Sequence, residues 1–273
     1  MTTDETEHIE RAKHYPYAVP RGSYVFASGR ELPIVAYGGD TLSVASMSVM
    51  VDQAMLTFPE YAASVAIPDA QLTASRTPVL CYGSNASKHV LARKFAHVDD
   101  EVVIPVVAGI LSDFDAVFSA HISSYGSIPA TLQSSPGTQL RVFILPMTDS
   151  QLDIMHVTEG PYNFGKLDQL ELAFGDDVVK QTVHTYISRN GALLINDTEV
   201  ALQPLEADHR RFPARTEEQM LAWLRDSLAP SQALDDFIRD HINDPDVRSM
   251  RSEWLHERSR RFGWTHWQTF SVA

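Results

Sequence analysis

The stretch with the clearest chemical potential is Pro78–Phe95, which reads PVLCYGSNASKHVLARKF. Its centre, Tyr82-Gly83-Ser84-Asn85, separates a short apolar run from a segment with helical spacing. Gly83 and Asn85 tolerate positive φ, so they favour a tight turn between the two. Such a turn would aim several backbone N–H groups, together with the Ser84 and Asn85 side chains, into one concavity that suits a carboxylate or an oxyanion. An ordinary strand-to-helix connection has the same spacing, and the residues alone leave both interpretations open.

A second candidate for chemistry is Glu159. A helix is predicted to begin at the capping box Thr148-Asp149-Ser150-Gln151 and to end at Gly160-Pro161, which places Glu159 in its last turn. The negative end of the helix dipole disfavours an ionised carboxylate, and partial burial would add to this effect. Both influences would suit Glu159 to accept and return a proton as a general base. A solvated surface glutamate is the alternative that its position leaves open.

The sequence lacks the motifs of nucleophilic, nucleotide-binding and metal-binding sites. The turn at Gly83 does not belong to a Gly-x-Ser-x-Gly nucleophile elbow, a P-loop or a dinucleotide fingerprint. The eleven histidines do not show the spacing of metal ligands, so no metal site is predicted. Cys81, the single cysteine, lies in an apolar run and is expected to be a buried structural thiol.

The elements that must hold these residues can be placed from periodicity. Val79–Cys81 is a short apolar run bounded by turn residues, which predicts a buried strand. From Ala86 onward a helix is predicted, with Ser84, Asn85 or Ser87 as its N-cap. One face of this helix carries Val90, Leu91, Lys94 and Phe95.

The remaining chain follows the same rules. Residues 1–14 are expected to form a mobile acidic tail, and the methionine-rich apolar stripe in Thr41–Ala63 predicts a helix packed on the core. Val178–Ile187 and Ala192–Ile195 are predicted to form a hairpin around Asn190-Gly191. Further strands are predicted at Tyr24–Ala27, Ile34–Tyr37, Val102–Leu111, Phe114–Ser119, Pro129–Leu132 and Gln139–Pro146.

Beyond Pro204 the sequence becomes helical. Three apolar stripes are predicted, the first after the capping box at Thr216, the second at Leu234–Ile242, and the third after Pro245. These helices carry or precede four tryptophans, too large an apolar surface to be left in water, so we expect them to pack on the core or on the N-terminal segment. The tryptophans are Trp223, Trp254, Trp264 and Trp267.

Composition limits the compartment and the partners. The chain has 273 residues and a net charge of −13, which disfavours nucleic acid and anionic membranes as partners. No window approaches the roughly 20 apolar residues of a membrane span. The acidic start and the single cysteine predict a cytoplasmic protein without a secretory signal or a disulfide framework.

Three segments together resemble the γ-glutamylcyclotransferase-like family over Pro78–Pro204. They are the strand with Tyr82-Gly83-Ser84-Asn85, the region from Gly109 to Leu132, and Val142–Leu145 leading to Glu159-Gly160. The resemblance implies an α+β fold built on a small mixed β-barrel with flanking helices. It also implies three parts in chain order: residues 1–76 as an N-terminal extension, 77–206 as the family domain, and 207–273 as a helical segment packed on the core.

What the resemblance implies for function is specific. The loop Tyr82, Gly83, Ser84 and Asn85 would hold the γ-glutamyl group of a small-molecule substrate, Glu159 would be the catalytic acid and base, and Tyr186 would line the pocket. The reaction would release 5-oxoproline and a free amine without a cofactor. Backbone N–H groups around the loop would stabilise the developing oxyanion.

The chain departs from the family in one respect, because the family's first strand normally lies near the N-terminus. Here residues 1–76 precede it and residues 207–273 follow the barrel. These terminal additions could reshape the pocket for an unusual γ-glutamyl amide or could mediate oligomers. Two alternatives therefore stay open: an amide hydrolase or acyl-transfer enzyme on the same fold, and a non-catalytic binding or assembly protein.

Overall fold

Two long strands, β6 (Val103–Phe118) and β7 (Ala130–Met147), run through the middle of the sequence. The sequence pattern predicts two strands in place of each, because Asp113 and Pro136-Gly137 interrupt the apolar runs. Asp113 and Gly137 do adopt positive φ, 68° and 85°. The Gly137 N–H donates to Asp113 Oδ1 at 2.7 Å. This bond gives the Gly137 N–H a partner at the point where both strands are irregular, and each strand continues beyond it.

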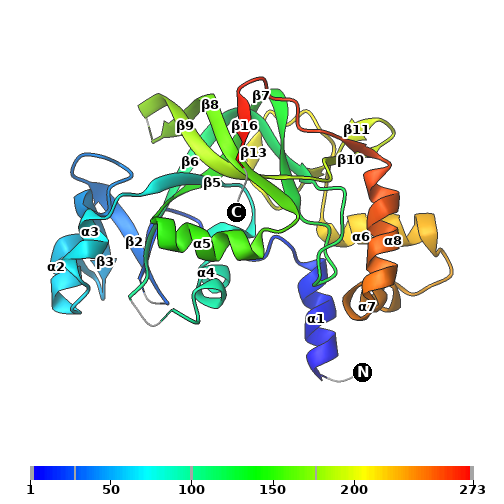
Figure 1. The fold of residues 1–273 in the computed structure, drawn as a ribbon, viewed down its shortest axis with the longest axis horizontal. Coiled ribbons are helices and arrows are strands. Elements are labelled where there is room, and N and C mark those ends of the chain that lie inside the picture. Colours follow the sequence, from blue (N-terminus) through cyan, green and yellow to red (C-terminus); the bar gives the residue numbers. More distant parts are fainter. Residues whose placement is uncertain (1–2, 28, 99–100, 176, 271–273) are drawn as a thin grey trace. The chain divides into compact units, whose positions relative to one another are not determined.

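The computed structural model describes residues 3–27, 29–98, 101–175 and 177–270. Across these residues the fold is mixed α+β, with a large mixed sheet and eight α-helices (Figure 1). The helices are α1 (Thr3–Lys13), α2 (Phe58–Ser64), α3 (Asp69–Thr73), α4 (Lys88–Lys94), α5 (Asp149–Thr158), α6 (Glu217–Leu228), α7 (Leu234–Asn243) and α8 (Pro245–His256). The other strands are β1 (Tyr24–Ala27), β2 (Arg30–Tyr37), β3 (Met47–Val51), β4 (Ala54–Thr57), β5 (Thr77–Cys81), β8 (Tyr162–Phe174), β9 (Asp177–Ser188), β10 (Ala192–Ile195), β11 (Thr198–Glu199), β12 (Ala201–Leu202), β13 (Ala207–Asp208), β14 (Ala214–Arg215), β15 (Ser259–Arg260) and β16 (Trp267–Thr269).

The chain forms two compact units, each assembled from three separate stretches. The first unit comprises residues 1–18, 112–140 and 187–265, and the second comprises 19–111, 141–186 and 266–273. Two of the switches between units fall inside β6 and β7. This division differs from the chain-order division into 1–76, 77–206 and 207–273 that the sequence analysis predicts.

The second unit holds the predicted site and is organised around β5. This strand pairs antiparallel with β7, where Leu80 faces Ile144, and parallel with β9, where Val79 faces His184. The sheet continues from β9 through β8, β6, β1, β2 and β3 to β4. Strands β6 and β7 also pair with each other. The strand predicted at Val79–Cys81 is therefore confirmed, and it lies in the interior of the sheet.

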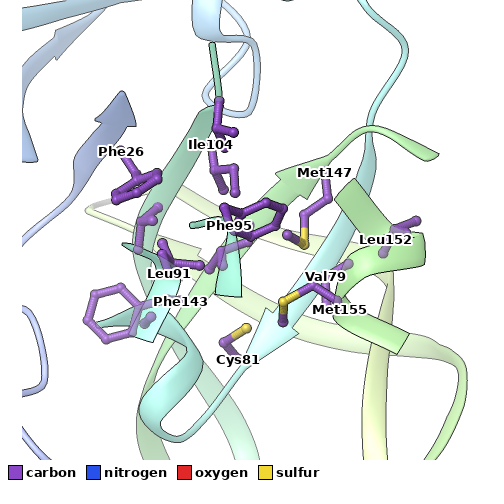
Figure 2. Close-up of a cluster of buried hydrophobic side chains, with 14 of the residues drawn as sticks. Phe26, Val79, Cys81, Leu91, Phe95, Ile104, Phe143, Met147, Leu152 and Met155 are labelled. Carbon is purple, nitrogen blue, oxygen red and sulfur yellow. The ribbon is translucent and has the colours of Figure 1, made fainter. Parts of the chain in front are cut away.

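A hydrophobic core packs between this sheet and the helices α4 and α5. Cys81 and Val79 from β5 lie among Leu91 of α4 and Met155 of α5, with each of these side chains at most 4% exposed (Figure 2). Burying a side chain of this size contributes about 1.5–3 kcal/mol to folding. The core therefore fixes the positions of α4 and α5 against β5. Figure 2 also shows Phe26, Phe95, Ile104, Phe143, Met147 and Leu152 in this core.

The predicted helix in Thr41–Ala63 is wrong over most of its length. Met47–Val51 and Ala54–Thr57 form the antiparallel strands β3 and β4, and only Phe58–Ser64 is α-helical, as α2. The turn between the strands holds Asp52 and Gln53 at φ values of 45° and 72°, the conformation of a two-residue hairpin loop. In β3, Met47 and Val49 are buried, which is the two-residue period of a strand. The closely spaced methionines of this segment also fit a helical period, so the sequence pattern did not reveal the strand.

The first unit contains α1 and the three C-terminal helices. The predicted mobile tail is wrong for its described part, because residues 3–13 form α1, which buries Ile9 and Ala12. Helices α6 and α7 both contact α1, so the expected packing of the C-terminal helices on the N-terminal segment is confirmed. Trp223 lies 5.8 Å from Trp254 between ring centroids. Among the described residues, no helix combines the length and the apolar character needed to cross a membrane.

The predicted hairpin around Asn190-Gly191 is also wrong. Strand β9 pairs within the large sheet, whereas β10 pairs with β11 and β15. Gly191 is needed for a different reason: its φ is 79°, and a Cβ there would lie 2.6 Å from the carbonyl oxygen of Arg260. The glycine thus allows its own backbone to lie close to the backbone of Arg260 in β15. Strand β8 precedes β9 in the sequence and pairs with it in the sheet, and the sequence pattern does not predict it.

Candidate functional site

The Tyr-Gly-Ser-Asn turn follows β5 directly, as predicted. Ser84–Ala86 form a single 3-10 turn, and α4 begins at Lys88 with Ser87 as its N-cap residue. Gly83 has φ −149° and ψ −147°, so the turn does not use the positive φ that this glycine tolerates. The Ser87 N–H donates to the Ser84 carbonyl at 2.9 Å, and the Tyr24 hydroxyl donates to the Ala86 carbonyl at 2.6 Å. These bonds order the turn between strand and helix.

Glu159 stands at the C-cap of α5, where the sequence places it. The predicted capping box is present: the Thr148 side chain accepts from the Gln151 N–H, and the Gln151 side chain accepts from the Thr148 N–H. At the other end, the Tyr162 N–H donates to the Glu159 carbonyl at 2.9 Å as the chain enters β8. The helix is therefore defined at both ends by local hydrogen bonds, and its last residue is held where α5 meets the sheet.

The structure brings Glu159 together with Asn85 and with Lys94. Asn85 Nδ2 donates to Glu159 Oε1 at 3.0 Å, and Lys94 Nζ donates to the same oxygen at 2.6 Å. The side chains of Lys94 and Glu159 are only 8% and 11% exposed. Helices α4 and α5 lie side by side beneath β5 (Figure 1), which makes this meeting of their C-terminal ends possible.

The two donors determine the electrostatics of the carboxylate. An ammonium group and an amide N–H both donate to one oxygen of the carboxylate in charge-assisted hydrogen bonds. Both bonds use Oε1, and Oε2 has no hydrogen-bond partner among the described residues. The carboxylate is therefore anchored by one oxygen while the other remains able to accept a proton.

We expect Lys94→Met to destabilise the protein by about 3 kcal/mol, because it leaves the Glu159 carboxylate mostly buried without its counter-charge. Urea unfolding of the variant measures this loss. Arg93→Met, on the exposed side of the same helix, is the matched control and should change stability by less than about 0.5 kcal/mol. The double variant Lys94→Met/Glu159→Gln should recover part of the loss. Wild-type stability of Lys94→Met alone would contradict the proposed role of the ion pair.

The two tyrosines of the predicted site contact each other through the backbone. The Tyr82 hydroxyl donates to the Tyr186 carbonyl on β9, and Tyr82 is 8% exposed. The Tyr186 hydroxyl shares a hydrogen bond of 2.8 Å with Nδ1 of His156. Burial raises the pKa of Tyr186 and lowers the pKa of His156, so both are neutral near pH 7. The structure thus joins Tyr186 to the turn through Tyr82 and to α5 through His156.

Cys81 is buried in the hydrophobic core and is not placed to react. Burial raises the pKa of its thiol to about 12, with a further increase from the Glu159 charge and a decrease from Lys94. The thiol is therefore protonated at neutral pH, in agreement with the structural role expected from the sequence. The described residues contain no group of three or more His, Cys, Asp or Glu side chains placed to hold a metal ion.

Sequence reasoning missed two members of the site, Lys94 and His156. Both carried a signal. Lys94 falls on the apolar face of its helix beside Leu91, and a lysine there requires a buried partner. His156 follows Leu152 by four positions and shares the inward face of α5.

Comparison with known proteins gives only distant similarities. No family model matches the sequence, and no curated protein matches it. Among solved structures, an uncharacterised protein from Homo sapiens is 14% identical, with 70% of this chain and 92% of that chain covered and a TM-score of 0.36. A γ-glutamyl cyclotransferase is 16% identical, with 69% and 90% covered and a TM-score of 0.34. YkqA from Bacillus subtilis is 12% identical, with 82% and 72% covered and a TM-score of 0.33. Similarities at this level do not assign an activity to the chain.

Proposed function

We propose that this chain is a cyclotransferase of the γ-glutamylcyclotransferase type, which converts a γ-glutamyl amide into 5-oxoproline and a free amine. The observation that carries the proposal is the 3.0 Å hydrogen bond from Asn85 to Glu159. It joins the two segments in which the sequence suggests chemistry, an anion-holding turn and a candidate general base. Intramolecular acyl transfer requires such a pair within the reach of one small substrate.

The reaction moves two protons from the substrate α-nitrogen to the leaving nitrogen, and Glu159 carries them one after the other. Its free Oε2 accepts a proton from the substrate α-ammonium, and the resulting amine attacks the γ-carbonyl carbon of the same molecule. A C–N bond forms to close the five-membered ring, and the original C–N bond to the leaving group breaks. Glu159 returns this first proton to the departing nitrogen, then takes the second proton from the ring nitrogen and passes it to the released amine. The products are a neutral lactam and an ammonium group, so atoms and charges balance without a cofactor.

The neighbouring residues position the reactants. Lys94 and Asn85 hold Oε1, so the carboxylate keeps one orientation throughout the cycle. Backbone N–H groups of the turn at Gly83–Asn85 would hold the substrate carboxylate or the developing oxyanion. The Tyr82–Tyr186 hydrogen bond ties the turn to β9. Most of the rate acceleration would then come from holding a flexible glutamyl chain in its folded conformation.

The direct test incubates the purified chain with a panel of γ-glutamyl amides that differ in the leaving amine. Product analysis by mass spectrometry separates three outcomes. Release of 5-oxoproline together with an equal amount of amine supports the proposal. Release of glutamate in place of 5-oxoproline would indicate an amide hydrolase, and binding of the amide without any product would indicate a binding protein.

The turn itself is tested by Gly83→Val. A branched side chain at this position would intrude where backbone and ligand approach, so we expect the affinity for 5-oxoproline to fall about tenfold or more. Isothermal titration on the folded variant measures the affinity. The matched control is Cys81→Ala, two residues away on β5, which should lower stability by about 1–2 kcal/mol with little effect on ligand affinity. Unchanged affinity in Gly83→Val would mean that the turn only connects strand to helix.

A further inference from the structure

The C-terminal segment of the chain is built into the second unit as an extra strand. In β16, Trp267 faces Leu167 of β8 and Thr269 faces Gly165, in antiparallel register. The Phe270 N–H then donates to the Phe164 carbonyl at 2.9 Å. This last bond fixes the backbone of Phe270 beside Phe164.

Gly165 makes this pairing possible. A Cβ at Gly165 would lie 2.4 Å from the Gln268 carbonyl oxygen and 2.5 Å from the Trp267 ring, so any larger residue would displace the strand. Glycine therefore stands where the backbone of β16 and its tryptophan cross β8. The sequence of β8 is adapted to receive the C-terminal strand.

The strand brings Phe270 into a row of aromatic rings. The Phe270 ring lies 5.7 Å from His184 and 6.3 Å from Phe164 between centroids. Phe164 stacks on His184 at 5.5 Å and contacts Tyr186 at 5.0 Å and His156 at 4.7 Å. These five residues, Phe270, His184, Phe164, Tyr186 and His156, are called the aromatic row below.

The aromatic row begins at the candidate catalytic carboxylate and ends at the surface. His156 lies one turn before Glu159 at the end of α5, and the Glu159 N–H donates to the His156 carbonyl at 3.2 Å. At the other end, Phe270 is 38% exposed, compared with 8% for Phe164. In between, Nδ1 of His184 is buried and has no hydrogen-bond partner in the part of the chain that the structure describes. A buried ring nitrogen without a partner leaves one polar position to be satisfied by a ligand.

We propose that the aromatic row binds the leaving amine of the substrate, and that this amine carries an aromatic ring. The inference rests on the proposed cyclotransferase function, since it is Glu159 that defines where the scissile amide lies. An aromatic group attached to the leaving nitrogen would extend from the carboxylate along Tyr186 and Phe164 toward Phe270. Offset stacking and edge-to-face contacts with these rings would recognise it, and His184 would supply one hydrogen bond. Phe270 is then a specificity-determining residue contributed by the C-terminal strand.

The test compares three substrates with identical charge: γ-glutamyl-phenylalanine, γ-glutamyl-cyclohexylalanine and γ-glutamyl-alanine. We expect the wild-type protein to process the phenylalanine amide with a kcat/KM about tenfold above that of the alanine amide, with the saturated ring in between. Phe270→Ala should bring the ratio of the first to the last close to one, and Phe270→Trp should retain most of it. Val178→Ala, an exposed position on β9 outside the aromatic row, should leave the ratio unchanged. Circular dichroism checks the fold of each variant.

The possible failures are distinguishable. If all three amides release 5-oxoproline with the same kcat/KM, the aromatic row does not select the leaving amine, while the proposed function stands. The inference is likewise overturned if Phe270→Ala keeps the wild-type ratio, since the aromatic row then serves only to pack the C-terminal strand. If none of the amides releases 5-oxoproline, the proposed function and the inference both fall.

Discussion

The Glu159→Gln variant is expected to fold and to release 5-oxoproline about 10²–10⁴ times more slowly than the wild-type protein, and by more if both proton transfers fail together. Glutamine has the same shape and retains an oxygen that can accept from Lys94 and Asn85, so the geometry around it should persist. What the amide lacks is the ability to take a proton from the substrate ammonium. Single-turnover measurement of 5-oxoproline on the folded variant therefore reports proton transfer directly.

A matched control is available on β2. Glu31→Gln makes the same chemical change at an exposed glutamate of the same unit and should keep the wild-type rate. Thermal unfolding of both variants shows whether a loss of activity reflects a loss of structure. Near-wild-type turnover in Glu159→Gln would rule out the proposed mechanism, because the amide of glutamine cannot act as the base.

Truncation after Pro213 is expected to give aggregated protein. It removes α6, α7 and α8, which contribute six fully buried apolar side chains to the first unit. Truncating one large buried apolar side chain costs about 2–5 kcal/mol, so losing six exceeds the whole stability of a typical domain, about 5–15 kcal/mol. The loss also exposes the apolar surface of α1 that these helices cover. The six residues, all fully buried, are Met220, Leu221, Leu224, Phe237, Ile238 and Leu255.

The buried Glu217 adds to this expectation, because its Oε1 accepts from the Ile128 N–H at 2.6 Å and that donor would lose its partner. Size-exclusion chromatography of the soluble fraction measures the outcome. Truncation after Thr265 is the control, since it keeps the three helices and removes β16 alone, and it should remain soluble. Monomeric, fully active protein after truncation at Pro213 would show that residues 214–273 form a separable module.

Features encoded by near neighbours in the sequence could be predicted from it. The capping boxes at Thr148 and Thr216 and the start of α8 at Pro245 all depend on residues within one helical turn, and the structure contains each of them. The strand before Tyr82 and the helical spacing after it were likewise recognisable. The pairing partners of strands were not, because a partner is chosen by contacts across the fold. The hairpin predicted at Asn190-Gly191 failed for this reason.

At the candidate site, the residue types and the local elements could be predicted from the sequence: a Tyr-Gly-Ser-Asn turn after a buried strand, and Glu159 at the end of a capped helix. The meeting of Asn85, Lys94 and Glu159 at one carboxylate oxygen depends instead on how α4 and α5 pack, which the local sequence does not encode. Lys94 and Glu159 are 65 positions apart, and the packing of α4 and α5 on β5 closes that distance. The need for glycine at position 165 could not be predicted either. A Cβ there would lie 2.4 Å from the Gln268 carbonyl oxygen, and this contact arises only because β16 pairs with β8. Periodicity describes what a segment can bury, whereas the chain's three-dimensional packing selects which buried groups face each other.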